Sequence, residues 1–320
     1  MGWASNGGII GPDNDLFVQS SSKRTTFNSS GTFTAAPLST TTNVSVLVVA
    51  GGGGSAYERS GGGGAGGYRE PSTQPVPASP LPVTVGAGGA AKTSPSSPEI
   101  GNQGSDSVFA TTSNPVTSEG GGYGAKGADG GDGGSGGGSS YPQDNNSGGA
   151  GNTPPVSPPQ GFLGNCGDDL PGSNEICGGG GGAGAAGVFG YNDGNLVPVR
   201  GTGGTGRPSN ASGSDVTYGG GGGGGGQVGA PAPGAFAGGS GGGGAGASAG
   251  AATAGSANTG GGGGGGGPQN SPGAGFPGPS SAAGGSGIVI VNEPKGTMVA
   301  SGVWDINFLY ESKVNDNWIS

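Results

Sequence analysis

The residues best suited to covalent chemistry in this chain are its two cysteines, Cys166 and Cys177. They enclose a loop of mainly Gly, Pro, Asp and Asn residues, a spacing that permits a disulfide if the protein matures outside the cell. The alternative is a pair of thiols that pack as small apolar groups. The sequence leaves both interpretations open.

Acid–base and metal chemistry have few candidates. The chain contains no His, which removes the commonest general base and the commonest metal ligand together. Asp129 with Asp132, and Asp168 with Asp169, are carboxylate pairs that could contact Ca²⁺, although paired Asp residues on surface loops usually bind no metal. No nucleophile, base and orienting group can be combined from this sequence. We therefore expect no enzyme activity, no metal and no other cofactor.

Residues 83–93 differ by one residue from a phosphate-binding loop after a strand. Ala91 stands where the second glycine of that motif belongs. Pro95 and Pro98 follow closely, so the helix whose N-terminus would bind phosphate cannot form. We expect no nucleotide binding here.

The elements that would position such residues are limited by composition. The 320 residues include 88 Gly and 25 Pro, which ordinary helices and strands reject. A net charge of −9 argues against nucleic acid and against an anionic membrane as partners. The longest aliphatic run, 44–50, is too short to cross a bilayer, and the N-terminus lacks the regions of a signal peptide, so we expect no membrane insertion and synthesis in a cytoplasm.

Glycine runs dominate the middle of the chain, and they follow neither a collagen nor a calcium-repeat period. A conventional helix or sheet of glycine loses about 0.5–1 kcal/mol per residue relative to alanine. The fold class that we expect is mostly irregular or β: a bundle of extended polyglycine helices of three residues per turn, with connecting loops, a small β-sheet at its base and one short C-terminal helix. The runs are 51–54, 61–64, 120–122, 136–138, 178–182, 219–226, 241–244 and 260–267.

Aliphatic segments border this region. They predict strands at 44–49, 81–85 and 288–291, and we expect the first and the last to pair. Asp305 as N-cap, with apolar residues at helical spacing after it, predicts the C-terminal helix. We divide the chain into an N-terminal attachment segment, a glycine-rich domain with variable loops and a C-terminal attachment segment, with the bounds 1–35, 36–291 and 292–320.

An ordered series of motifs carries a family resemblance. Val46–Ser55, Gly61–Tyr68, Val83–Gly89 and finally Asn258–Thr259 with the run 260–267 before Gly284–Val291 resemble the glycine-rich domain of bacteriophage tail proteins. In overall plan the chain also resembles the tail-fibre tip adhesins of T-even-like phages. That resemblance implies polyglycine helices that carry variable receptor-binding loops.

The two ends resemble short terminal motifs of tail proteins in marine phages, where such motifs flank unrelated inserts. Residues 7–14 and 301–318 carry this likeness. It implies that the two ends form one attachment unit, whereas two independent tails are the alternative. The candidate attachment residues are Trp3, Ile9, Ile10, Trp304, Tyr310 and Trp318.

If successive runs alternate in direction, the connecting loops separate into two groups. We expect 55–60, 139–147, 188–200, 227–237 and 268–279 at the end far from the paired strands, and 152–177, 207–218 and 247–259 at the base. Exposed aromatic residues among small flexible ones are typical of recognition surfaces, although aromatic plugs over the ends of the glycine region are an alternative. The candidate receptor-binding residues are Tyr57, Tyr141, Phe189, Tyr191, Phe236 and Phe276.

These features predict a phage tail-fibre adhesin in the virion, made in the host cytoplasm and exposed outside the cell. Its expected partners are other tail or tail-fibre proteins and a bacterial outer-membrane protein or surface glycan. The main alternative is a structural fibre or decoration protein that recognises no receptor. A spike that degrades polysaccharide with loop carboxylates is a third interpretation.

Overall fold

The structure, a computed structural model, describes most of the chain between residues 22 and 294. The expected helix after Asp305 and all six candidate attachment residues lie outside the described residues. The described ranges are 22–35, 41–77, 80–95, 99–110, 114–140, 146–167, 176–191, 200–226, 236–248, 250–268 and 281–294.

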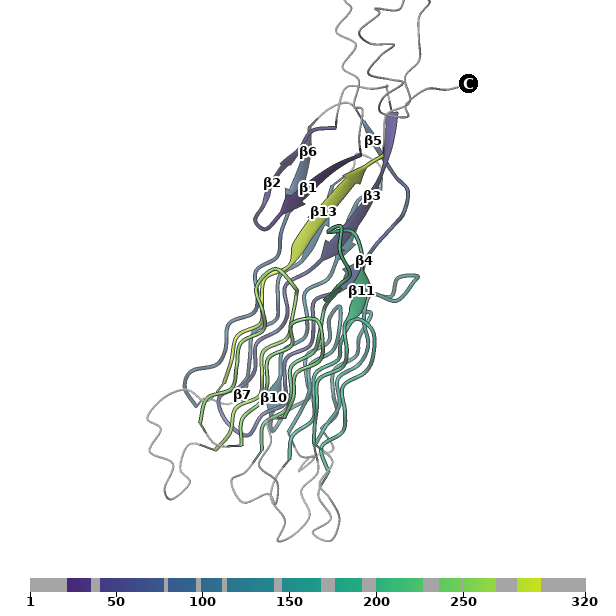
Figure 1. Cartoon of the computed structure of the whole chain (residues 1–320). Coiled ribbons are helices and arrows are strands. Elements are labelled where there is room, and N and C mark those ends of the chain that lie inside the picture. Colours follow the sequence, from purple (N-terminus) through teal and green to yellow (C-terminus); the bar gives the residue numbers. More distant parts are fainter. Residues whose placement is uncertain are drawn as a thin grey trace, which may run out of the picture.

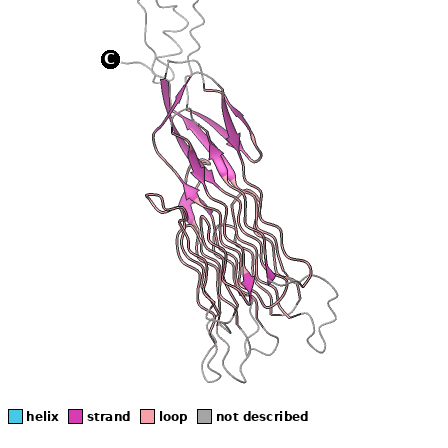
Figure 2. Ribbon diagram, turned by 180° about the vertical axis from the view of Figure 1, so that it is seen from behind, coloured by secondary structure: helices cyan, strands magenta, loops and turns pink. Residues whose placement is uncertain are grey.

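Regular structure in these ranges consists of short strands, most of them at one end of the molecule (Figure 2). The strands are β1 (Lys23–Phe27), β2 (Gly31–Phe33), β3 (Thr41–Val49), β4 (Tyr68–Arg69), β5 (Gln74–Pro77), β6 (Leu81–Thr84), β7 (Glu99–Ile100), β8 (Ser107–Phe109), β9 (Val116–Ser118), β10 (Ala125–Lys126), β11 (Arg207–Ser209), β12 (Val216–Tyr218) and β13 (Ile288–Glu293).

The central pairing joins β3 with β13, which are far apart in the sequence. They run antiparallel, with Val49 opposite Ile288 and Val46 opposite Val291, as the sequence predicts. β1 pairs with the other edge of β13, and β4 and β5 pair with β3. A second sheet has the order β2-β6-β8-β9, while β7 with β10 and β11 with β12 form two-stranded sheets. All these pairings are antiparallel.

Both faces of β3 and β13 are buried, which explains their uninterrupted aliphatic sequences. Val46 and Val48 belong to a core shared with Phe33 and Phe109, whose rings meet edge to face at 5.7 Å between centroids. On the opposite face, Leu47 and Ile290 belong to a cluster that includes Tyr68, Ala183 and Tyr218. Apolar packing is thus concentrated in one small core instead of being spread along the chain.

The glycine runs are extended segments that lie side by side below this core (Figure 1). The N–H groups of Gly61 and Gly64 donate to Ala125 and Gly122, while those of Gly62 and Ala65 donate to Gly178 and Gly181. Those of Gly63 and Gly66 donate to residues 263 and 260. The N–H groups of this run therefore reach three neighbouring runs, and its carbonyls accept from three others: those of Gly62, Gly63 and Gly64 accept from Gly138, Gly222 and Gly53. The same neighbour recurs at every third residue.

Close approach of backbones explains why these positions are glycine. A Cβ on Gly222 would overlap the carbonyl oxygen of Gly263, and one on Gly63 would overlap that of Gly53. Backbone hydrogen bonds between runs replace the missing side-chain packing, because buried N–H and C=O groups must find partners.

This architecture corrects the expected fold class. The described residues contain no helix, and their regular structure is strands in several antiparallel sheets, so the bundle of polyglycine helices is wrong. The regular structure lies instead in strands, where side chains such as those of Val46 and Phe109 form a core, whereas the glycine runs are extended segments joined to one another by backbone bonds.

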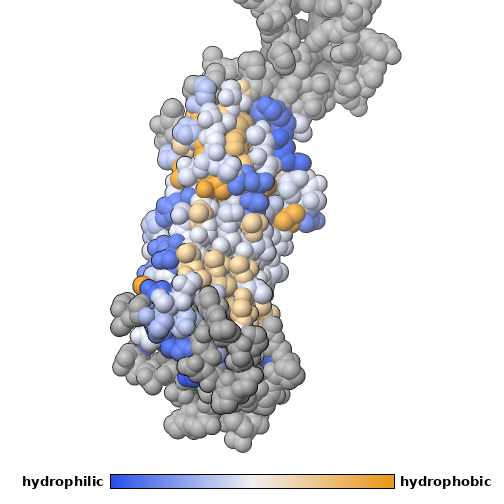
Figure 3. Space-filling view, turned by 90° about the vertical axis from the view of Figure 1, so that its left-hand side faces the viewer, coloured by the Kyte–Doolittle hydropathy of each residue, from blue (hydrophilic) through white to orange (hydrophobic). Residues whose placement is uncertain are grey.

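The described part is elongated, and its two ends differ. We call the end with β1, β3 and β13 the sheet end, and the end with β7 and β10 the loop end (Figure 1). The surface between them is mostly pale in the hydropathy colouring, as expected for glycine-rich backbone, with hydrophilic residues along one side of this view (Figure 3).

Candidate functional site

Connections between runs gather at the loop end. The N–H of Ser60 donates to Gly266, that of Ser140 to Ala125 in β10, and Ile176 pairs with Gly226 as an isolated bridge. These contacts place loop 55–60 at the loop end, as predicted. They also place there the described residues next to 141–145, 168–175, 227–235 and 269–280.

Two of the loops assigned to the base are placed differently by the structure. In 152–177, Gln160 accepts from the N–H of Tyr68 near β4, yet Ile176 lies at the loop end. The reason is an additional extended run, 161–167, which lacks a block of glycines and therefore gave no signal. In 247–259, Ala247 bonds to Gly265 near the loop end, whereas Thr259 bonds to Gly219 near the sheet end.

The described candidate aromatics occupy different environments. Phe189 is 36% exposed, and its ring lies 6.4 Å from that of the half-buried Tyr191. Tyr57 is half-buried in loop 55–60. Phe236 is only 2% exposed, and its ring lies so close to Gly226 that a Cβ there would overlap it, so Phe236 packs as a plug. Tyr141 and Phe276 lie outside the described residues.

An ion-pair cluster supports loop 55–60 from below. Lys126 of β10 has its Nζ 2.9 Å from Glu99 Oε2 of β7 and 3.1 Å from Glu58 Oε1 of the loop. Burial by itself would lower the pKa of Lys126, but hydrogen bonds and charges from Glu99 and Glu58 outweigh it, so the pKa is raised. The lysine stays charged and holds Tyr57's loop against the short β7–β10 pair.

The two cysteines flank residues 168–175. Cys166 is half-buried and its carbonyl accepts from the N–H of Gly190, while Cys177 is buried and its N–H donates to Gly225. The structure does not test a bond between them, so the disulfide stays a prediction.

The carboxylates of Asp129 and Asp132 accept hydrogen bonds from backbone N–H groups. Asp129 accepts from the N–H of Ser147 at 2.7 Å, and Asp132 accepts from the N–H of Ala150. Asp168 and Asp169 lie outside the described residues. Among the described residues no group of three or more acidic or thiol side chains could hold a metal ion, and none of the described segments is a helix able to span a membrane.

Residues 83–93, which resemble a phosphate-binding loop in sequence, form part of the glycine scaffold. The N–H groups of Gly89 and Lys92 donate to the carbonyls of Gly52 and Ser55. A Cβ on Gly88 would overlap the Gly284 carbonyl, so this glycine permits contact between runs.

The described chain begins and ends at the same place. Lys23 of β1 lies opposite Glu293 of β13, with Lys23 Nζ 3.6 Å from the buried carboxylate of Glu293. The start of β1 and the end of β13 thus lie together at the outer edge of the sheet end, far from Ser60, Ser140 and Ile176 at the loop end. The segments before residue 22 and after residue 294 leave the described part next to each other.

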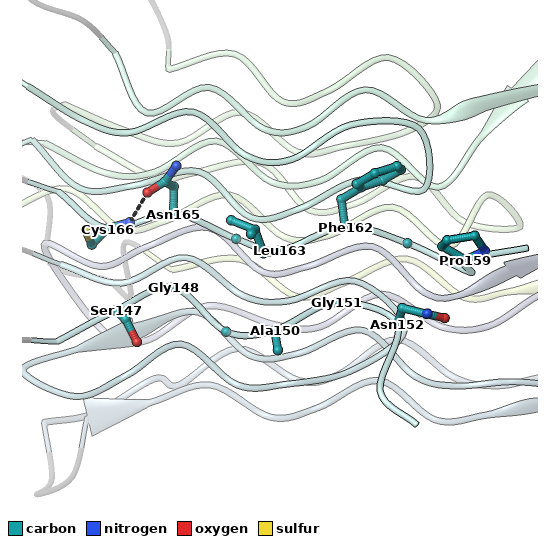
Figure 4. A pocket seen from close by; sticks show the side chains of 13 residues that line it. Ser147, Gly148, Ala150, Gly151, Asn152, Pro159, Phe162, Leu163, Asn165 and Cys166 are labelled. Atoms are coloured by element: carbon teal, nitrogen blue, oxygen red, sulfur yellow. Dashed lines mark hydrogen bonds between the residues drawn. The ribbon is translucent and has the colours of Figure 1, made fainter. Parts of the chain in front are cut away.

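Sequence reasoning missed a groove on the side of the molecule. It has a volume of about 620 Å³ and lies between the extended segments 147–152 and 159–166 (Figure 4). Phe162 and Leu163, which are 37% and 50% exposed, line it from the second segment (Figure 4). These two residues lie between a proline-rich and a cysteine-containing segment. Two consecutive apolar residues are too few to predict a strand, a helix or a binding site.

The fold and these surfaces define a class: a glycine-rich scaffold with a small β core at one end and connecting loops at the other. A model of the family described as "glycine-rich domain" matches residues 26–293, and the chain belongs to that family. No curated protein matches the chain significantly.

Proposed function

We propose that the protein is a bacteriophage tail-fibre adhesin that recognises a bacterial surface receptor through its loop end. The carrying observation is the separation of the two ends: connections gather at one, and the described chain begins and ends at the other. The series of motifs that resembles phage tail proteins supports the same proposal.

The proposed receptor face combines rigid support with aromatic contact area. Phe189 and Tyr191 lie on an extended run whose N–H groups at Gly187 and Gly190 donate to the neighbouring run, so the rings start from a fixed backbone. Aromatic side chains provide large contact areas at low entropic cost, which suits a recognition surface. The receptor is an outer-membrane protein or a surface glycan.

The sheet end is the proposed attachment side. The segments 1–21 and 295–320 start from one edge of β1 and β13, so they can join one partner among the other tail or tail-fibre proteins. In this proposal the protein acts in the virion, outside the cell, after synthesis in the host cytoplasm.

Competition for adsorption tests the proposal. Purified protein should block phage adsorption to host cells, and the double variant Phe189→Ala/Tyr191→Ala should lose most of this effect. Phe162→Ala is the matched control, because Phe162 is equally exposed but lies on the side of the scaffold. Failure of the wild-type protein to compete, together with regular polymerisation, would favour a structural fibre protein; release of reducing sugar from host polysaccharide would favour an enzyme.

A further inference from the structure

The groove between 147–152 and 159–166 resembles a place in the glycine scaffold where one extended run is missing. Its two walls are neighbouring extended segments, joined by the bond from the Gly164 N–H to the Gly149 carbonyl at 3.0 Å. Figure 4 shows these segments side by side, with Ala150 on one and Leu163 on the other. Ser147 and Ala150 on one wall and Phe162 and Leu163 on the other are exposed.

Hydrogen bonds on the first wall follow the three-residue repeat of the interior runs. The N–H groups of Ser147 and Ala150 donate to Asp129 and Asp132, so two carboxylates satisfy one side of this segment. Those of Gly149 and Asn152 donate to Gly137 and Gly134 on a second side. The third side consists of Gly148 and Gly151, whose N–H groups donate to no described residue.

The second wall repeats this arrangement. Residues 162 and 165 donate to Gly182 and Gly179. On another side, the N–H groups of Gln160 and Cys166 are both satisfied by asparagine side-chain oxygens, from Asn152 and Asn165. Leu163 lies midway between Gln160 and Cys166, and its N–H donates to no described residue, nor do the carbonyls of Gly161 and Gly164 accept from one.

The free groups of both walls therefore have the spacing of the interior contacts. Gly148 and Gly151 are three residues apart, as are Gly161 and Gly164, and an extended chain covers about 10 Å in three residues. Within the scaffold, groups at this spacing bind the backbone of another extended run, as Gly61 and Gly64 do with Ala125 and Gly122.

From this correspondence we propose that the groove binds an extended, glycine-rich segment of a partner polypeptide, which completes the scaffold as an additional run. Backbone N–H groups of Gly148, Gly151 and Leu163 donate to its carbonyls, and the exposed side chains of Phe162 and Leu163 cover its flank. Main-chain pairing of this kind gives affinity in the way that a peptide strand adds to an exposed sheet edge. The proposal does not depend on receptor recognition at the loop end.

A polypeptide fits these groups better than a sugar does. The free donors and acceptors are backbone groups at a regular spacing, and the charged side chains beside them, Asp129 and Asp132, are already bonded to the wall. A glycan site generally needs several convergent polar side chains around an aromatic ring. Here the nearby amide oxygens of Asn152 and Asn165 accept from the protein's own N–H groups.

Fluorescence anisotropy with a synthetic peptide tests the inference. The probe is a labelled peptide of four Gly-Gly-Ala repeats, and the comparison peptide has four Ala-Ser-Ala repeats, whose side chains prevent close approach. We expect saturable binding of the first peptide by the full chain and at least about tenfold weaker binding of the second. Equal affinity for the two peptides, or no saturable binding of the first, would overturn the inference.

Substitution of Ala150 locates the binding. Ala150 is exposed and lines the groove, so Ala150→Trp should fill the space and weaken peptide binding at least tenfold. Ala254→Trp is the matched control at an exposed alanine outside the groove and should leave binding unchanged. Equal melting temperatures of the two variants exclude misfolding as the cause. Unchanged binding by Ala150→Trp, or binding of N-acetylglucosamine oligomers at this position in place of the peptide, would contradict the proposal.

Discussion

Single residues in this protein contribute mainly through what their backbones allow. Glycine at positions such as 63 and 222 brings carbonyls and N–H groups of separate runs together, and one added carbon would overlap a neighbouring carbonyl. Side chains act chiefly where a neighbouring run is missing. Asp129, Asp132 and Asn165 then supply the oxygen that a backbone carbonyl supplies elsewhere.

Gly222→Ala tests the importance of close approach. The new Cβ would overlap the Gly263 carbonyl, so the two runs must move apart and lose bonds on both sides. Overpacking costs typically about 1–3 kcal/mol in an ordinary core, and we expect at least about 3 kcal/mol here because the neighbour is backbone. Chemical denaturation measures the loss, with Ala254→Val at an exposed site as the control. A loss below that of the control would show that the runs tolerate side chains.

Glu119 provides a test through pH. Burial raises its pKa, and the charge and hydrogen bond of Asp106 raise it further, so the folded state favours the protonated carboxyl. Stability from this group is therefore complete below its unfolded pKa and is lost as pH rises through the higher folded value. Glu119→Gln should stabilise the protein relative to wild type more at pH 7 than at pH 4. Melting curves at both pH values decide this, and a larger gain at pH 4 would contradict the assignment.

At the scale of elements, strands and glycine runs have separate tasks. β3 and β13 hold the first and last parts of the glycine region together through a two-faced apolar core. The runs extend from that core, and an interior run such as 61–66 exchanges hydrogen bonds with six neighbouring runs. Apolar burial in β3 and β13 fixes the two ends of the glycine region, and backbone hydrogen bonds between the runs hold the rest of that region in place as far as the loop end.

The β13 core should be sensitive to truncation. Ile290 is fully buried, and Ile290→Ala should destabilise the protein by about 2–5 kcal/mol because a cavity replaces the packed side chain. Thr26 lies opposite Ile290 on β1 but is exposed, so Thr26→Ala should change stability by less than about 0.5 kcal/mol. Urea titrations of both variants provide the comparison, and similar effects would argue against the central role of this core.

The molecule as a whole is a cooperative lattice of contacts between residues distant in sequence. Gly63 bonds to residues in two runs, 219–226 and 260–267, and these runs bond to each other and to further runs. No single run can leave without breaking bonds in several others. The two ends of the described part are therefore connected through one continuous network of backbone bonds.

Hydrogen exchange should reveal this cooperativity. Amides of interior residues 62–64 are bonded between runs and should exchange only through global unfolding. Amides of Gly148 and Gly151 in the groove should exchange quickly and become protected when the Gly-Gly-Ala peptide is added. Exchange measured by mass spectrometry with fragmentation resolves both sets. Rapid exchange at residues 62–64 would show that the runs open independently.

Some of this organisation was determined by the sequence alone. The aliphatic segments at 44–49 and 288–291 predicted strands that pair, and the structure confirms their pairing in β3 and β13. Alternation between runs placed loop 55–60 correctly. These predictions succeeded because apolar strands and turn-rich loops carry local signals in their side chains.

The tertiary structure alone decided which runs are neighbours and which residues face no neighbouring run. It also decided that no helix forms in the described residues. Glycine has no side chain, so a glycine run contains no local information about its partners. The choice depends on backbone bonds between residues such as 63 and 263, which are set by the path of the whole chain. The burial of Phe236 and the groove beside Leu163 follow from that path. The sequence therefore determined where glycine runs and apolar strands occur, whereas the fold determined which of their residues are exposed.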